Sequence, residues 1–468
     1  MPGAIRRYGE PGLDNVRLLR RGTVCSDKEV ARFTLRADNF TQVRLAYGEE
    51  AAALALDELA GRVNRLLRGS GSATPEPDGR VDCRLSSLAA MEDAACADAC
   101  RAWLWSLCAA MSCLPVEAGE GNVLLLLSGA WDLPPPSVAP ENLRGIAPWQ
   151  HETVAGDADR APGSRAERYR ADMALAVDLM SAISPDVAAR PDGDRLLLLW
   201  QPVRDARELE DSLYYEALLR IVDRDGERLS PQSTLGAFER LGLSRVLDHH
   251  IVSRVLTELE LDPDVRLGVN ISAYSARRDP WWDDVARRLR AMPSVARRLT
   301  IEITETAALP DISAAVRFVT SMKRLGCHIA LDDFGAGYAS IRHLLALAPD
   351  VVKIDRAFLQ RATLDDRGRG VFTHLAGLAA SLAPTVIAEG VETEDQAALC
   401  RSLGIDWQQG YLWGRPSAGR VWRVAGDWRS AAVLARRSAG HLSVAPPAML
   451  PGASPVAAAF IGPAGAGA

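Results

Sequence analysis

The sequence predicts an α/β protein whose larger part is a (β/α)8 TIM-like barrel with an antiparallel first strand pair. Short apolar segments alternate with intervals that mostly can hold a helix, from about Asp194 to Gly426. Most of these segments end in a polar residue. The interval after the first segment, VRDARELEDS, is too short for a parallel crossover, which needs about a dozen residues, so the first two strands should pair antiparallel.

The expected barrel strands are residues 196–202, 213–221, 266–272, 299–305, 328–334, 350–355, 385–390 and 407–413. Before them, residues 30–136 mix short apolar runs, such as 123–127, with a helical stretch at 50–67, which predicts a smaller α/β domain. Residues 164–183 are expected to form an amphipathic connector helix, opened by a capping box of Ser164 and Glu167.

The expected boundaries follow from these segments. They are an N-terminal extension (1–29), the smaller α/β domain (30–136), a linker with the connector helix (137–193), the barrel domain (194–426) and a tail (427–468). The tail carries no charged residue from His441 onward and is broken by prolines, so we expect it to be disordered.

Composition excludes several classes of protein. The net charge of −6 argues against a general affinity for nucleic acid or an anionic membrane, but not against a small anion held by metal ions. The N-terminus lacks the apolar core of a signal peptide, and no apolar run is long enough to span a bilayer, so we expect a cytoplasmic protein. Its cysteines, including Cys96, Cys100, Cys108 and Cys113, are then expected to be reduced, and these four to be buried thiols on a helix.

The polar residues at the strand ends predict a functional site, because the carboxyl ends of barrel strands meet at one rim. In chain order they are Gln201, Glu216, Asn270, Glu302, Asp332, Asp333, Lys353, Glu389 and Gln409. A single carboxylate at a strand end often only caps the next helix, but the repetition along eight strands favours a site.

The residue types at this rim favour a particular chemistry. Carboxylate and amide oxygens without His or Cys select Mg²⁺ or Mn²⁺. The set suffices for two ions sharing a bridging group, an arrangement that activates water for displacement at phosphorus. Lys353 adds a point charge, and Arg220 could clamp a phosphate. A glycosidase needs only two carboxylates, and does not need Asn, Lys and adjacent aspartates.

Ordered motifs between about Asp172 and Pro416 resemble the EAL-domain phosphodiesterases, which hydrolyse cyclic di-GMP. They are WQPV from Trp200, EALLR from Glu216, VNIS from Val269, IEITE from Ile301, ALDDFGAGY from Ala330, VKID from Val352, IAEGVET from Ile387 and QGYLWGRP from Gln409. The resemblance implies hydrolysis of one phosphodiester of cyclic di-GMP to linear pGpG, in second-messenger signalling that usually controls motility and biofilm formation.

The resemblance also implies roles for single residues. Glu216, Asn270, Glu302 and Asp332 would bind a first ion, and Asp332 would bridge to a second ion held by Asp333 with Glu389 nearby. Lys353 would orient the attacking water, Glu389 is a candidate base, and Glu305 would support the loop after Asp333. Substrate contacts are implied for Gln201, Leu218, Arg220, Asp355 and Gln409. Ala336 and Ala339 replace a Thr and a Ser that are usual in that loop, and Ile221 replaces a common Trp.

Residues 30–136 resemble a degenerate GGDEF domain, the cyclase fold that makes cyclic di-GMP. Arg36 replaces a metal-binding Asp, Arg44 and Leu45 occupy positions that contact the nucleotide, and SSLAA (86–90) stands where GGDEF is expected. The resemblance therefore implies no cyclase activity, but a regulatory or dimerising domain, or one that only packs. Family members are often homodimers. A non-catalytic cyclic di-GMP receptor that acts through a protein partner is the alternative function.

Overall fold

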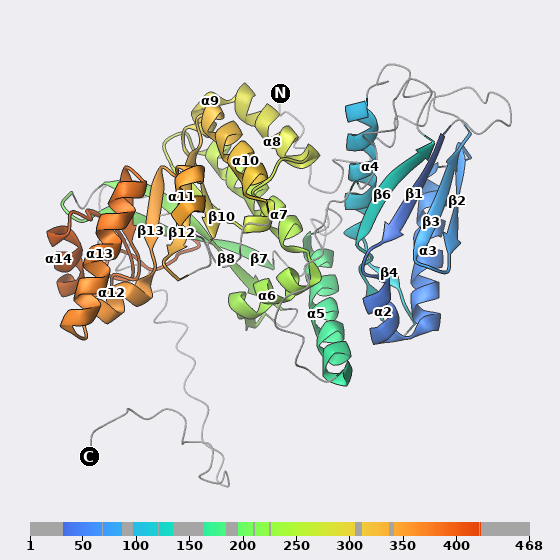
Figure 1. Ribbon diagram of the computed structural model, residues 1–468, viewed down its shortest axis with the longest axis horizontal. Coiled ribbons are helices and arrows are strands. Elements are labelled where there is room, and N and C mark those ends of the chain that lie inside the picture. Colours follow the sequence, from blue (N-terminus) through green and yellow to red (C-terminus); the bar gives the residue numbers. More distant parts are fainter. Residues whose placement is uncertain are drawn as a thin grey trace, which may run out of the picture. The chain divides into compact units, whose positions relative to one another are not determined.

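The computed structural model describes residues 31–67, 69–86, 97–119, 121–133, 146, 162–183, 195–208, 211–223, 226–304, 311–336, 341–420 and 422. These residues form two larger sheets, one in the N-terminal part of the chain and one in the barrel (Figure 1). The expected tail and the extension at 1–29 lie outside the described residues.

The barrel is closed and has the predicted strand order. Its strands are β7 (Leu196–Asp205), β8 (Ser212–Val222), β10 (Leu267–Ile271), β11 (Leu299–Thr304), β12 (His328–Phe334), β13 (Val351–Ile354), β14 (Thr385–Ala388) and β15 (Trp407–Gln409). Strands β10 to β15 pair in chain order, β15 pairs with β7, and β8 pairs with β10 to close the ring. The short β9 (Arg228–Leu229) adds to β8 alone.

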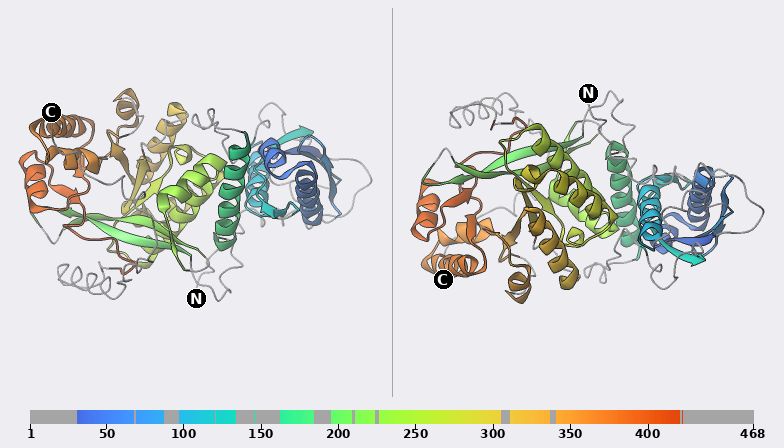
Figure 2. Two further views of the ribbon diagram at one scale, coloured as in Figure 1. Left: turned by 90° about the horizontal axis from the view of Figure 1, so that it is seen from below. Right: turned by 90° about the horizontal axis from the view of Figure 1, so that it is seen from above.

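The predicted antiparallel first pair is confirmed. β7 runs antiparallel to both β8 and β15, whereas every other neighbouring pair of the ring is parallel. The two green strands β7 and β8 lie side by side in both views of Figure 2. The short connection from β7 leaves no room for a helix, so the chain returns directly.

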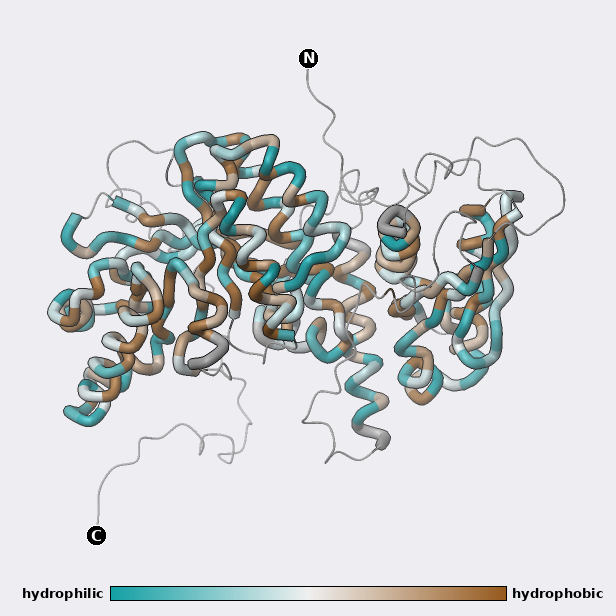
Figure 3. Tube along the Cα trace, turned by 45° about the horizontal axis from the view of Figure 1, so that its top comes forward, coloured by the Kyte–Doolittle hydropathy of each residue, from teal (hydrophilic) through white to brown (hydrophobic). Residues whose placement is uncertain are grey.

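Helices follow the parallel strands and cover the barrel (Figures 1 and 2). They are α6 (Pro231–Leu241), α7 (Ser244–Leu261), α8 (Pro280–Ala291), α9 (Pro293–Ala296), α10 (Ile312–Leu325), α11 (Ile341–Leu347), α12 (Arg356–Ala362), α13 (Asp366–Leu382) and α14 (Glu394–Ser402). Side-chain caps such as Asp279, Asp311 and Thr393 start several of them, and left-handed Gly242 and Gly326 end α6 and α10. Hydrophobic and polar residues alternate along them, as a one-sided core contact requires (Figure 3).

The barrel interior is layered because side chains on one face of a strand recur every second residue. An apolar cluster inside the barrel contains Val203, Tyr214, Ala330, Val351 and Ile387. Each of these residues stands two positions from one of the predicted site residues, on the same strand or, for Ile387 and Glu389, across the end of β14. The candidate site therefore forms the next layer toward the carboxyl ends of the parallel strands.

The N-terminal part contains an antiparallel sheet in the order β2-β3-β1-β6. Its elements are β1 (Ala31–Ala37), α2 (Phe40–Tyr47), α3 (Glu49–Leu67), β2 (Gly71–Glu76), β3 (Arg80–Leu85), α4 (Ala97–Ser112), β4 (Val116–Glu117), β5 (Asn122–Val123) and β6 (Leu127–Leu133). Buried Phe33, Trp103 and Trp131 contact one another, with ring centroids 5.3–5.6 Å apart. This aromatic contact joins β1, α4 and β6.

The apolar run 123–127 contains the end of β5 at Val123 and the start of β6 at Leu127. Buried Asn39 binds the intervening segment: it donates to Leu124 O at 2.8 Å and accepts from Leu126 N at 2.9 Å. The helical stretch expected at 50–67 is α3.

The connector helix α5 (Pro162–Ile183) is present, but the capping box at Ser164 is wrong. The helix begins at Pro162, a residue type whose fixed φ suits the first turn, so Ser164 lies inside the helix. Asp172 on α5 accepts two hydrogen bonds from Arg240 on α6, at 2.8 and 2.7 Å.

The cysteine prediction is confirmed for Cys100 and Cys108, which lie buried on α4, but Cys113 is half-buried and lies just after that helix. Cys96 lies outside the described residues. In the described part of the chain, no helix is long and apolar enough to cross a membrane.

Candidate metal-dependent active site

The centre of the candidate site is the buried ammonium of Lys353, which β13 carries into the barrel. Its Nζ lies 3.1 Å from Glu216 Oε2, 2.7 Å from Glu302 Oε2, 2.8 Å from Asp332 Oδ1 and 2.8 Å from Glu389 Oε1. The four carboxylates come from β8, β11, β12 and the end of β14. The barrel therefore brings together four acids that are far apart in the sequence, as the strand ends predict.

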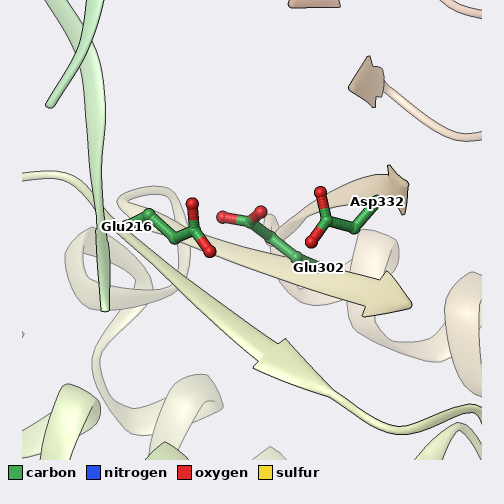
Figure 4. Close-up of side chains that lie close together, drawn as sticks. All are labelled: Glu216, Glu302 and Asp332. Carbon is green, nitrogen blue, oxygen red and sulfur yellow. The ribbon is translucent and has the colours of Figure 1, made fainter. Parts of the chain in front are cut away.

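These acids form two groups that share Asp332. Glu216, Glu302 and Asp332 offer carboxylate oxygens within 4.8 Å of one another, and so do Asp332, Asp333 and Glu389. Figure 4 shows the carboxylates of Glu216, Glu302 and Asp332 turned toward one another from β8, β11 and β12. Two sites with a common carboxylate are the arrangement in which one residue can bridge two ions.

Amide side chains lie around Glu216 and hydrogen-bond to it. Asn270 donates to Glu216 Oε1 at 2.5 Å, and Gln409 donates to Glu216 Oε2 at 2.6 Å. Gln201 lies opposite Glu216 in the β7–β8 register and donates to Gly414 O at 3.1 Å. The predicted Asn270, Gln201 and Gln409 thus all lie at the site.

Burial and charge act in opposite directions on the ionisable groups. Burial disfavours the charged form of Lys353, but Asp332, Glu216, Glu302 and Glu389 outweigh it and raise the Lys353 pKa well above its usual value. Burial also opposes ionisation of Glu216, yet Lys353 and the amide hydrogen bonds lower its pKa.

The other carboxyls show the opposite balance. Burial raises the pKa of Glu302, Glu389 and Asp332, and neighbouring carboxylates add to it against the pull of Lys353. Burial, then Asp332 and Asp355, raise the pKa of Asp333 to about 6. One ammonium does not neutralise so many acids, so additional positive charge stabilises their ionised forms.

Several buried oxygens at the site have no hydrogen-bond partner among the described residues. They are Glu302 Oε1 and Oε2, Asp332 Oδ1, Asn270 Oδ1 and Gln409 Oε1. Glu302 Oε2 and Asp332 Oδ1 face Lys353 as ion pairs, but their contacts lack hydrogen-bond geometry. Buried polar atoms are normally satisfied, so these oxygens fit the ligands of a cation.

The loop after β12 begins in an unusual backbone conformation. Asp333 has a φ of 56°, a left-handed value that Asp tolerates better than most residues. Gly335 follows with a φ of 97°, and a Cβ there would lie 2.7 Å from a ring atom of Phe358. Ala336 is exposed and donates to Asp333 O at 3.0 Å. The predicted Glu305 and Ala339 lie outside the described residues.

The remaining predicted substrate residues lie just beyond the acidic centre. Leu218 and Arg220 are half-buried and alternate with buried residues on β8, on the same strand face as Glu216. Arg220 donates to Leu219 O at 2.8 Å, so the structure pairs it with backbone rather than with a carboxylate of the centre. Asp355 follows Lys353 and caps α12 by accepting from Ala357 N at 2.9 Å.

Two residues at the site escaped the sequence analysis. Gly268 precedes Asn270 by two positions, and a Cβ there would lie 2.2 Å from Glu302 Oε1. Tyr214 precedes Glu216 by two positions, and its ring borders the same point, at 2.6 Å. The two-residue period of the strands was the available signal for both.

The fold and the site together define a class of protein: an eight-stranded α/β barrel with a carboxylate-rich rim. Residues 186–416 match the family model of the EAL domain. This matched segment, a little under half of the chain, is therefore similar to the EAL domain.

Two relatives show the extent of the similarity. The chain is 32% identical over 227 residues to "Cyclic di-GMP phosphodiesterase PdeF" of Escherichia coli, covering 48% of this chain and 30% of the relative. It is 27% identical over 234 residues to "Cyclic di-GMP phosphodiesterase PdeB" of Shewanella oneidensis, covering 49% of this chain and 27% of the relative. The chain thus spans less than a third of the length of either.

The chain also matches parts of solved structures. "PaMucR Phosphodiesterase, c-di-GMP complex" is 29% identical, with a TM-score of 0.46, and the match covers 52% of this chain and 98% of that one. The FimX EAL domain of Pseudomonas aeruginosa bound to c-di-GMP is 23% identical, with a TM-score of 0.43 and coverage of 52% and 97%.

Proposed function

We propose that this protein hydrolyses one phosphodiester of cyclic di-GMP to linear pGpG, with two Mg²⁺ or Mn²⁺ ions at the barrel rim. The observation that carries the proposal is the pair of acidic groups that share Asp332 around a buried lysine. The EAL-domain match and the relatives named cyclic di-GMP phosphodiesterases support the choice of cyclic di-GMP as the substrate. The site chemistry alone indicates only a phosphate ester.

The residues present fit two hard divalent cations. Glu216, Asn270, Glu302 and Asp332 would hold the first, and Asp332, Asp333 and Glu389 the second. When bound, such ions neutralise phosphate charge and make water a better nucleophile at neutral pH. The carboxylates repel a phosphate until that charge is supplied, which makes the proposed activity dependent on metal.

The chain's own groups bind and orient the reactants. Lys353 is fixed by ion pairs on several sides and is assigned to orient the attacking water. Glu389 is the most accessible of the four acids around Lys353, with 17% of its side chain exposed, and is assigned as the proton acceptor. Gln201, Leu218, Arg220, Asp355 and Gln409 are assigned to substrate.

We further propose that the N-terminal sheet and its helices are a degenerate GGDEF-like domain without cyclase activity. The proposal is supported by the resemblance of residues 30–136 to such a domain and by an α/β element order of strand, two helices, two strands, helix and late strands. Arg36 is exposed at the end of β1, and exposed Leu45 lies on α2. Neither side chain can bind a metal ion, so purified protein given GTP and Mg²⁺ should form no cyclic di-GMP.

One experiment separates the proposed enzyme from a non-catalytic receptor. Purified wild-type protein and Glu216→Gln are incubated with cyclic di-GMP and Mn²⁺, and the products are separated by chromatography. Wild type should release pGpG, whereas Glu216→Gln, which loses a ligand of the first ion, should be slower by at least about 100-fold. Binding of cyclic di-GMP without turnover by the wild type would establish the receptor instead.

A further inference from the structure

The antiparallel strands β7 and β8 carry site residues on one face and two large aromatic residues on the other. Gln201 and Glu216 lie opposite each other in the register of this pair, and both belong to the candidate site. Trp200 and Tyr215 are their chain neighbours, so they point to the opposite face, outside the barrel. Both aromatic residues are nevertheless buried. Because the short β7–β8 connection has no room for a helix, another part of the chain must cover them.

The covering segment follows β15, and we call residues 414–422 the strap. Its first contact with β7 is at the site, where Gly414 O accepts a hydrogen bond from Gln201 Nε2 at 3.1 Å. Ser417 then exchanges two backbone hydrogen bonds with Trp200, of 2.8 and 3.1 Å. The strap therefore runs along β7 as an additional, irregular partner of that strand.

Trp422 ends the strap and joins three elements at one point. Its ring centroid lies 5.4 Å from that of Trp200 on β7 and 5.0 Å from that of Tyr215 on β8. Its Nε1 donates to Asp262 Oδ2 at 2.8 Å, at the end of α7. Aromatic contacts of this kind contribute about 0.5–1.5 kcal/mol each beyond the area that they bury.

The last part of the strap lies outside the segment that is similar to the EAL domain. The family model matches residues 186–416, so the match assigns no role to Ser417 or Trp422. The contacts of these two residues nevertheless fall on the two strands that carry Gln201 and Glu216.

We propose that Trp422 is a positioning residue, which packs on Trp200 and Tyr215 from outside the barrel and so fixes the backbone that carries Gln201 and Glu216. A movement of β8 at Tyr215 also moves the adjacent Glu216, whose carboxylate is held by Gln409 and Lys353 inside the site. Metal ligands need such fixed support to keep their geometry. The inference rests on the metal site of the proposed function, but does not depend on the identity of the substrate.

The first test needs no metal. Amide hydrogen exchange is followed by mass spectrometry in metal-free wild type and Trp422→Ala. We expect a larger rise in exchange in peptides from β7 and β8 than in peptides from β11 and β12, because the strap contacts only the first pair. Equal exchange of β7 and β8 in the two proteins would overturn the inference.

The second test is titration of Mn²⁺ into the same proteins, with free Mn²⁺ measured by electron paramagnetic resonance. Trp422→Ala should bind Mn²⁺ about tenfold more weakly, as expected when the support of a metal ligand is lost. Trp422→Phe keeps an aromatic ring against β7 and β8 and should recover most of the affinity. The matched control is Trp105→Ala, which removes a half-buried tryptophan from α4, outside the barrel, and should bind Mn²⁺ like wild type.

The outcomes separate the inference from the proposed function. Faster exchange of β7 and β8 with unchanged Mn²⁺ affinity would mean that Trp422 supports only the fold, which overturns the inference. Equal losses of affinity in Trp422→Phe and Trp422→Ala would also overturn it, because the bond to Asp262 would then matter and the ring contacts would not. If wild type binds no Mn²⁺, the proposed metal site fails, and the exchange experiment decides by itself whether Trp422 fixes these strands.

Discussion

The absence of a Cβ atom at Gly268 leaves room for two side chains at the barrel centre. A Cβ at this position would lie 2.2 Å from Glu302 Oε1 and 2.6 Å from the Tyr214 ring, distances that real Cβ atoms do not adopt. The backbone of β10 is held by its pairing to β8 and β11, so the side chains must move instead.

We therefore expect Gly268→Ala to lower activity and Mn²⁺ affinity by at least about tenfold, because it displaces a metal ligand. Steady-state hydrolysis and Mn²⁺ titration measure the two effects. The control is Gly377→Ala on α13, where a Cβ meets nothing within 4 Å. That substitution should raise stability by up to about 1 kcal/mol without changing activity, since alanine favours a helix. Equal activities of wild type and Gly268→Ala would contradict the described packing.

Asp333 makes metal binding sensitive to pH near neutrality. Burial and its acidic neighbours raise the pKa of Asp333 to about 6, so below that pH the carboxyl is protonated and a cation must displace the proton. The pKa values of Glu302 and Glu389 are also raised, so protonation of these carboxyls opposes metal binding in the same direction.

Apparent Mn²⁺ affinity should therefore fall as pH drops from about 7.5 to 5.5, by up to about tenfold per pH unit for each proton displaced. Asp333→Asn cannot take up that proton, so its affinity should be weaker at neutral pH and change less steeply. Titrations at several pH values measure both slopes. The same pH dependence in both proteins would exclude Asp333 from the metal site.

At the residue scale, the sequence predicts most of the acidic centre but misses Tyr214 and Gly268, which lie beside Glu302. Asp332 and Lys353 could be found because each lies near the end of an apolar strand, whereas Glu216 lies in the middle of β8. The two-residue period places Tyr214 and Gly268 on the site face of their strands, but their contacts with Glu302 cross between strands and cannot be predicted from that period. The sequence gives only the neighbours of a residue along its own strand, and not the residues that contact it from other strands.

At the scale of elements, α7 holds the end of β10 where Asn270 lies. Asp248 on α7 accepts hydrogen bonds from Ser272 N at 2.8 Å, Ser272 Oγ at 2.7 Å and Ser275 Oγ at 2.6 Å. Ser272 follows β10 directly, so one carboxylate fixes the turn that carries a predicted metal ligand.

We expect Asp248→Ala to destabilise the protein by about 3 kcal/mol, because it leaves three buried or half-buried donors without a partner. Chemical denaturation measures this loss. The control is Asp284→Ala on α8, an exposed partner of Arg287, which should cost less than about 1 kcal/mol. Similar losses for both variants would show that the Asp248 network contributes little.

The elements themselves were largely predictable, and their ends were not. All eight barrel strands were found, because buried strands appear as short apolar runs. The capping box at Ser164 failed because Pro162 starts α5 two residues earlier. The ends of β5 and β6 within the run 123–127 could not be predicted, because Asn39, which is remote in sequence, binds the segment between them through hydrogen bonds.

At the scale of the whole barrel, the antiparallel direction of β7 was predictable from the length of the connection between β7 and β8. A connection too short for a crossover leaves only an antiparallel return. The closure of the ring through β8 and β10 follows from the strand count and brings Glu216 beside Gly268 in register. The sequence could not give the register itself, which determines which side chains share a layer.

The central claim is that the acids around Lys353 form a metal-dependent phosphodiesterase site. Its most direct test is hydrolysis of cyclic di-GMP by the purified, metal-stripped full chain as Mn²⁺ is added. The account predicts no turnover without metal, and activity that rises to a plateau as the two sites fill. Turnover that is the same with and without Mn²⁺, or absent at saturating Mn²⁺ and Mg²⁺, would contradict it.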